Sequence, residues 1–161
     1  GLVLVAEPTR LVKLEGHDVV ARADMASVSQ TQVTLVSGGG SGHEPAFAGY
    51  VGEGMLTAAV CGGVFASPPA SAVLAAIRAV CGPHGCLVLV MNYTGDRLNF
   101  GMAVERAKAE GLRVCMHVVG DDCALSRGKG ITGRRGVAGT VLVGKVAGAA
   151  AEAGMSLDEV S

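Results

Sequence analysis

The feature that most constrains the fold is an alternation of short apolar runs with helix-length segments. The run at residues 86–90 (CLVLV) contains no polar residue, which predicts a strand buried on both faces of a sheet. Neighbouring strands of this kind are parallel and are joined through helices, because a parallel pair needs a long crossover connection. We therefore predict an α/β fold, a three-layer sandwich with a mostly parallel sheet built from β-α repeats.

The individual elements are predicted from apolar periodicity, from prolines before helices and from glycines after them. We expect strands over residues 32–36, 57–60, 86–90 and 114–119, and helices over residues 45–51, 70–80, 97–110 and 140–153. Nearer the N-terminus, residues 6–8 predict a turn and residues 19–21 an added edge strand. The 161 residues, half of them hydrophobic, suit a single α/β domain over 1–161.

Composition argues against several classes of partner. The net charge of −1, the 3% of aromatic residues and the scattered Lys and Arg residues predict no nucleic-acid partner. No apolar stretch reaches the ~18 residues that a membrane span needs. The five cysteines lack the spacing of metal ligands, so we expect free thiols, no metal site and a reducing, cytoplasmic location.

Residues 36–45 (VSGGGSGHEP) follow a predicted strand and indicate a small-ligand site. Glycine permits close approach of the backbone to a ligand, and His43 titrates near neutral pH. The segment is neither G-x-G-x-x-G nor a loop ending in Gly-Lys-Ser/Thr, so ATP is not its expected ligand. The alternative is a tight strand-to-helix turn that needs glycine for geometry alone.

Ligands of open α/β sheets bind beyond the carboxyl ends of the strands. We expect three loops to line one rim there, at residues 38–44, 92–97 and 120–122. For Asp96 the alternative to a ligand contact is an ordinary helix N-cap, and for Asp121 and Asp122 it is capping of the following segment or exposure to solvent.

Several motifs, in this order and at this spacing, resemble the substrate-binding K domain of the dihydroxyacetone kinases. They are SGGGSGHEPAFAGYVGEGML, CGGVFASPPASAVLAAIRAV, NYTGDRLNFGMA and GDDCAL. The C-terminal segment GRRGVAGTVLVGKVAGAAAEAGMSLDEV resembles the animal triokinase/FMN cyclase branch of that family. The resemblance covers nearly the whole chain and corresponds to the N-terminal half of the K domain.

The resemblance implies an ATP-dependent kinase of dihydroxyacetone or glyceraldehyde. By that likeness Gly40, Ser41, Gly42, His43 and Asp96 bind the substrate, and His43 and Asp96 orient and polarise its hydroxyl for attack on a phosphoryl group. It also implies that ATP and Mg²⁺ are bound by a separate helical L domain and not by this chain, and that the K domain forms a homodimer.

Two departures from the family pattern matter. Met91 stands where the family usually has a lysine, so either a hydrogen bond to the substrate is lost or the pocket has adapted around an apolar side chain. The family's covalent histidine corresponds to a position beyond Ser161. The chain is therefore interpreted as part of an enzyme that is inactive alone, or alternatively as a non-catalytic remnant that binds small sugars or proteins.

Overall fold

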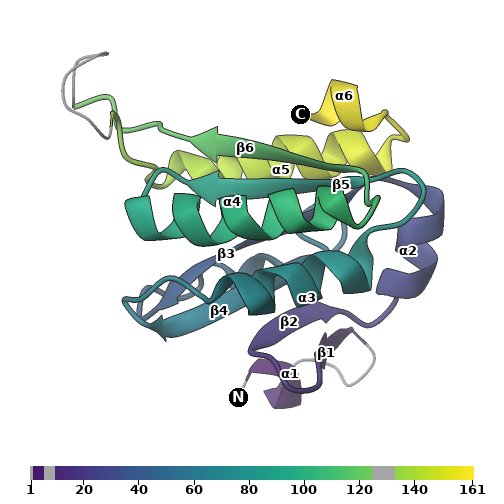
Figure 1. The fold of residues 1–161 in the computed structure, drawn as a ribbon, viewed down its shortest axis with the longest axis horizontal. Helices are drawn as coiled ribbons and strands as arrows, with labels where there is room; N and C mark the ends of the chain where they lie inside the picture. The colour runs from purple at the N-terminus through teal and green to yellow at the C-terminus, as the bar shows by residue number, and fades with distance from the viewer. Residues whose placement is uncertain (1, 6–9, 125–132) are drawn as a thin grey trace.

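The computed structural model describes residues 2–5, 10–124 and 133–161. These residues form a six-stranded sheet with helices on both faces (Figure 1). The strands are β1 (Leu11–Lys13), β2 (Val19–Arg22), β3 (Thr34–Ser41), β4 (Ala58–Val64), β5 (Cys86–Met91) and β6 (Val114–Val119). The helices are α1 (Leu2–Val5), α2 (Met25–Thr31), the 3₁₀ helix η1 (Ala48–Tyr50), α3 (Ala70–Val80), α4 (Thr94–Ala109), α5 (Gly139–Glu152) and α6 (Leu157–Val160).

The sheet has the strand order β1-β2-β4-β3-β5-β6. Strands β4, β3, β5 and β6 are parallel to one another, whereas β2 is antiparallel to both β4 and β1. The predicted mostly parallel sheet is therefore confirmed. The segment predicted as an edge strand at residues 19–21 is β2 and lies inside the sheet, because β1 pairs with its outer side. The carboxyl ends of the four parallel strands share one edge of the sheet.

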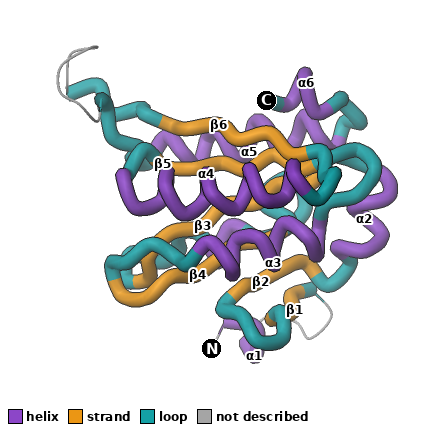
Figure 2. The backbone as a smooth tube through the Cα atoms, viewed as in Figure 1, coloured by secondary structure: helices purple, strands orange, loops and turns teal. Residues whose placement is uncertain are grey.

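Two apolar clusters lie on opposite faces of the sheet, which confirms the three layers (Figure 2). Val88 of β5 packs with Ile77 and Phe100 in the cluster under α3 and α4. Its neighbour Leu87 packs with Ala151 of α5 in the other cluster. Successive residues of a strand point to opposite faces, and both of these side chains are buried because helices cover each face of the sheet.

The glycine run lies within strand β3, although we predicted that the strand would end at residue 36 and that residues 38–44 would form a loop. Strand β3 continues to Ser41 and pairs with β4, with Gly38 opposite Val60. A Cβ at Gly38 would lie 2.2 Å from the Val60 carbonyl oxygen, so only glycine permits this close pairing. The predicted helix over residues 45–51 is correspondingly short, since only η1 is helical.

The other predicted elements agree with the structure to different degrees. Helix α3 and strand β6 have the predicted bounds, and α5 is offset by one residue at each end. Helix α4 begins at Thr94 instead of residue 97, and β4 extends to Val64. Helix α2 was not predicted, because its polar sequence MASVSQT lacks apolar periodicity. The turn predicted at residues 6–8 lies outside the described residues.

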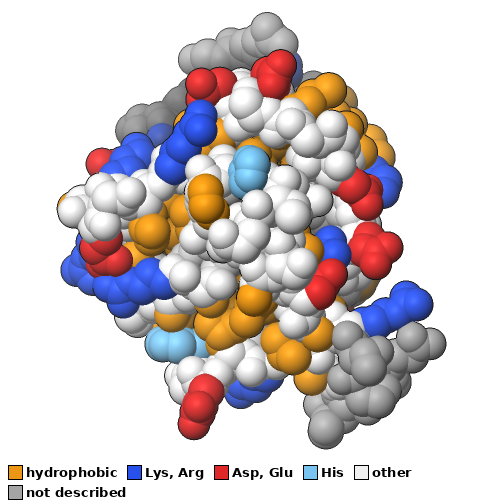
Figure 3. All heavy atoms as spheres, turned by 90° about the vertical axis from the view of Figure 1, so that its right-hand side faces the viewer, with side chains coloured by type: hydrophobic (Ala, Val, Ile, Leu, Met, Phe, Trp, Pro, Cys, Tyr) orange, Lys and Arg blue, Asp and Glu red, His pale blue; other side chains and the backbone are white. Residues whose placement is uncertain are grey.

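Figure 3 shows the face at the amino ends of the parallel strands, on the side of the sheet opposite their carboxyl ends. Basic and acidic side chains are interspersed over it, without a broad area of one sign. Within the described ranges, no helix has the length and apolar character needed to cross a bilayer.

Candidate functional site

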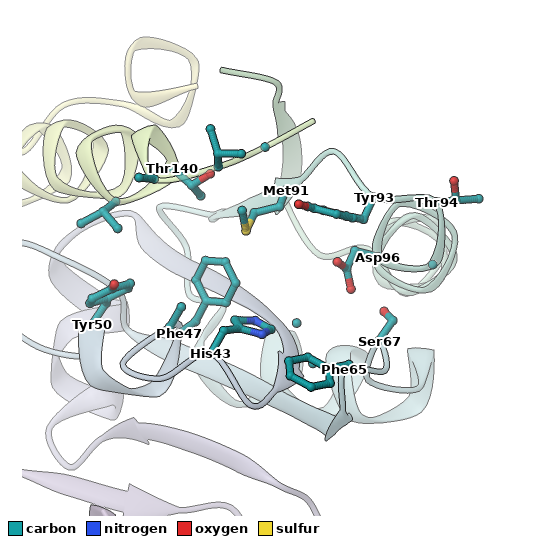
Figure 4. A pocket seen from close by; sticks show the side chains of 18 residues that line it. His43, Phe47, Tyr50, Phe65, Ser67, Met91, Tyr93, Thr94, Asp96 and Thr140 are labelled. Atoms are coloured by element: carbon teal, nitrogen blue, oxygen red, sulfur yellow. The ribbon is translucent and has the colours of Figure 1, made fainter. Parts of the chain in front are cut away.

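A cavity of about 760 Å³ opens at the carboxyl edge of the sheet (Figure 4). Its wall is built by the end of β3, the loops after β3, β4 and β5, the first turn of α4 and the segment that enters α5. This is the position expected for a ligand site in an open α/β sheet, beside the point where the strand order reverses. The volume lies within the ~300–1,000 Å³ typical of small-molecule pockets.

Asp96 points into this pocket from the first turn of α4. The N-cap residue of α4 is Tyr93, so the alternative in which Asp96 is an ordinary N-cap is wrong. The Asp96 Oδ1 atom is buried without a hydrogen-bond partner among the described residues, and the same holds for Ser67 Oγ. Burial raises the pKa of Asp96, and the nearby Ser67 hydroxyl and the charge of His43 oppose the rise only in part.

His43 lies on the same pocket wall, in the loop after β3. Its ring stacks on Phe65, with 6.2 Å between the ring centroids and an angle of 18° between the planes. The residue before it, Gly42, has a φ of +110°, which glycine adopts readily. The Gly42 N–H donates to the Glu44 carboxylate at 2.9 Å, so this turn closes on itself and directs His43 toward the pocket.

Only part of the predicted glycine and serine segment lies in the pocket lining. Gly40 lines the pocket, and a Cβ there would lie 2.7 Å from the Ala66 nitrogen. Ser41 does not line the pocket, because its hydroxyl donates to the Gly62 carbonyl at 2.7 Å. Gly42 is likewise outside the lining. The close approach of the Val60 backbone thus explains Gly38, while Gly40 and the turn before His43 shape the pocket wall.

The third predicted loop, residues 120–122, does not line the pocket. The Asp121 carboxylate instead accepts hydrogen bonds from the backbone N–H groups of Val137, at 2.7 Å, and Gly139, at 2.8 Å. These donors lower the pKa of Asp121. Asp122 accepts a hydrogen bond from the Ala124 N–H at 3.0 Å. The capping alternative is confirmed for Asp121, which holds the start of α5 against the pocket.

Sequence reasoning missed Ser67, whose side chain lies beside Asp96 in the pocket (Figure 4). Ser67 lies in the loop after β4, and the rule about carboxyl ends of strands applies to that loop as much as to the other three. The aromatic wall formed by Phe47 and Tyr50 was also missed, since a helix was expected there. Thr140 of α5 contributes a further buried hydroxyl that has no partner among the described residues.

The charge of the lining bears on which groups it can hold. No Lys or Arg is among the described residues that line the pocket, although the Arg135 guanidinium carbon lies 5.5 Å from the centre of the Tyr93 ring at its rim. Across residues 2–5, 10–124 and 133–161, no three His, Cys, Asp or Glu side chains are grouped so that they could hold a metal ion. A site for Mg²⁺ and a nucleoside triphosphate needs oxygen ligands for the metal and cationic contacts to the phosphates. The described residues that line the pocket do not fit such a site.

Comparisons with known proteins identify the family of this chain. Residues 1–161 match the Dak1 domain. The chain is 64% identical over 143 residues to a putative 3,4-dihydroxy-2-butanone kinase of Solanum lycopersicum, covering 89% of this chain and 24% of that protein. It is 56% identical over 160 residues to the triokinase/FMN cyclase of Mus musculus, covering 98% and 27%.

A solved structure has the same fold. The dihydroxyacetone kinase of C. freundii in complex with AMP-PNP and Mg²⁺ superposes with a TM-score of 0.89 at 52% identity, over 98% of this chain and 29% of that one. The chain therefore belongs to the Dak1 domain family. It spans about a quarter of the length of these relatives.

Proposed function

We propose that this Dak1 domain forms the substrate-binding part of a kinase that phosphorylates dihydroxyacetone or glyceraldehyde. The observation that carries the proposal is the pair of buried polar atoms without partners, Asp96 Oδ1 and Ser67 Oγ, in one pocket at the carboxyl edge of the sheet. Buried polar groups are nearly always hydrogen-bonded, and these two would be satisfied by a small ligand that carries hydroxyl groups. The relatives named as kinases of dihydroxyacetone and related compounds support this ligand class.

Asp96 is the residue suited to accept the proton of the substrate hydroxyl. Its burial raises its pKa, which makes the carboxylate a stronger base than an exposed aspartate. Ser67 can donate a hydrogen bond to the same hydroxyl oxygen and so orient one of its lone pairs. The His43 imidazole, which also lines the pocket, can donate a hydrogen bond to a second substrate oxygen. Catalysis by these groups consists mainly of positioning the hydroxyl and removing its proton.

ATP with Mg²⁺ would supply the phosphoryl group, and we propose that both are bound outside the residues described. A helical ATP-binding domain or subunit is the proposed partner, and a homodimer formed through the Dak1 domain is the proposed assembly. A cytoplasmic location is supported by the five cysteines, all of which are free thiols.

The proposal is tested by phosphorylation assays on the polypeptide that carries this chain, supplied with its ATP-binding part. Asp96→Asn should lower kcat for dihydroxyacetone by roughly 10²- to 10⁴-fold, the usual contribution of a general base. Asp122→Asn is the control, because Asp122 is an acid in the same region that does not line the pocket. Wild-type activity of the Asp96→Asn variant would contradict the assignment of Asp96.

A second set of measurements tests whether this chain is inactive by itself. Residues 1–161 alone should show no phosphorylation of dihydroxyacetone with ATP and Mg²⁺. Reductive trapping with dihydroxyacetone should add no mass to any histidine of this chain, because the proposed covalent histidine lies outside it. Turnover or a trapped adduct in the isolated chain would refute this division of roles.

A further inference from the structure

The pocket has a polar corner and an apolar half. Asp96, Ser67 and His43 form the polar corner. The apolar half is lined by Phe47, Tyr50, Met91, Val137 and Val141. A small ligand that places its reacting hydroxyl at Asp96 must therefore direct its other end toward apolar side chains.

Met91 lies at the boundary between these two parts. It is the last residue of β5, and its side chain points into the pocket between Phe47 and Tyr93 (Figure 4). It also packs against the apolar cluster that contains Phe47 and Leu89, so the core fixes its position. A thioether donates no hydrogen bond and accepts only weakly. Met91 therefore presents an apolar surface, held in place by the fold, to the end of the ligand that does not react.

A ligand end placed against Met91 is selected by its polarity. A hydroxyl there would lose hydrogen bonds to water, and Phe47 and Met91 offer none in return, so among the labelled side chains beside Met91 only the Tyr93 hydroxyl could replace one of them (Figure 4). A methyl group would bury apolar surface instead. The hydroxyls of Tyr50 and Thr140 lie on the far side of Phe47 and Met91 from Asp96 (Figure 4).

We propose that Met91 is a specificity-determining residue, and that it adapts this pocket to short hydroxyketones whose non-reacting end is a methyl group or another small alkyl group. The inference rests on the proposed function, since it takes Asp96 as the position of the reacting hydroxyl. It favours the adapted-pocket interpretation of Met91 over a simple loss of substrate affinity.

The test compares two ligands that differ by one hydroxyl group, hydroxyacetone and dihydroxyacetone. Affinity and kcat/KM are measured for both with the polypeptide that carries this chain, as wild type, Met91→Leu and Met91→Lys. Met116→Lys is the matched control, because Met116 is exposed on β6 and does not line the pocket. Tyr93→Phe is included because Figure 4 shows the Tyr93 hydroxyl beside Met91.

We expect the wild type and Met91→Leu to bind hydroxyacetone at least as tightly as dihydroxyacetone. Met91→Lys should change the ratio of the two affinities by about tenfold in favour of dihydroxyacetone, which corresponds to ~1.4 kcal/mol. Met116→Lys should leave the ratio unchanged, and Tyr93→Phe should shift it further toward hydroxyacetone.

Three results would overturn the inference. They are an unchanged ratio in Met91→Lys, a wild type that binds dihydroxyacetone more tightly than hydroxyacetone, and a Met91→Leu variant that behaves like Met91→Lys. If Met91→Lys does not fold, the wild-type and Met91→Leu ratios still decide the question. Phosphorylation of neither ketone by the wild type would instead contradict the proposed function itself.

Discussion

Replacing Asp96 by asparagine should stabilise the fold at neutral pH while it removes activity. The substitution keeps the shape of the side chain and removes its charge. In the native structure Oδ1 is buried without a partner among the described residues, and burial raises the pKa of this carboxyl. The ionised form is therefore less favourable in the folded chain than in the unfolded chain.

The magnitude follows from the charge alone, because the asparagine amide leaves a polar atom at the same buried position. An unpaired buried charge costs more than an unpaired neutral group, whose penalty is about 1–3 kcal/mol. Asp96 is only partly buried, so we take a difference of about 1 kcal/mol at pH 7. For a domain of this size that free energy corresponds to a rise of about 2–4 °C in Tm. Thermal unfolding of residues 1–161, followed by circular dichroism, measures it.

The pH dependence gives a sharper test. A carboxyl with a raised folded pKa binds more protons in the folded state, so its contribution to stability is fully present below the unfolded pKa of about 3.9 and is lost as pH rises through the folded pKa. The Tm advantage of Asp96→Asn should therefore be largest at neutral pH and vanish near pH 3. Asp24→Asn should show the opposite sign, because Arg22 lowers the pKa of Asp24 through hydrogen bonds of 2.8 and 2.7 Å. A lower Tm for Asp96→Asn at pH 7 would refute the reasoning.

Two further substitutions test the supports of the pocket. Asp121→Ala removes two hydrogen bonds at the start of α5 and should lower the free energy of unfolding by about 1–2 kcal/mol. Asp122→Ala loses one hydrogen bond in a loop and should cost less than half of that. Urea unfolding of both variants measures these losses, and equal losses would contradict the role of Asp121. Gly38→Ala forces a Cβ to within 2.2 Å of the Val60 carbonyl oxygen and should cost about 3 kcal/mol or more, whereas Gly63→Ala meets nothing closer than 3.8 Å and should fall within about 1 kcal/mol of wild type. Urea unfolding measures this pair as well, and equal urea midpoints for the two variants would show that β3 and β4 can move apart to admit a Cβ without loss of stability.

Much of the fold follows from local sequence. The apolar run at β5 predicts a buried parallel strand because no polar face remains to meet water. The prolines before Ala70 and the apolar spacing of residues 70–80 determine the bounds of α3, which were predicted to the residue. The glycine run and Asp96 could be assigned to a single site, since both follow strands that end at the same edge of the sheet.

Long-range contacts decided the rest. The pairing of Gly38 in β3 depends on the backbone of Val60 in β4, which approaches too closely for a Cβ at that position. Asp121 binds the start of α5 because residues 135–139 lie beside residues 121–122, a pairing that no local pattern predicts. Ser67 and Asp96 meet only because α3 and β5 carry the chain between them along the sheet and back to the same edge. Local pattern specifies which segments are strands or helices, whereas the pairing of distant backbones specifies which polar atoms remain without partners in the pocket.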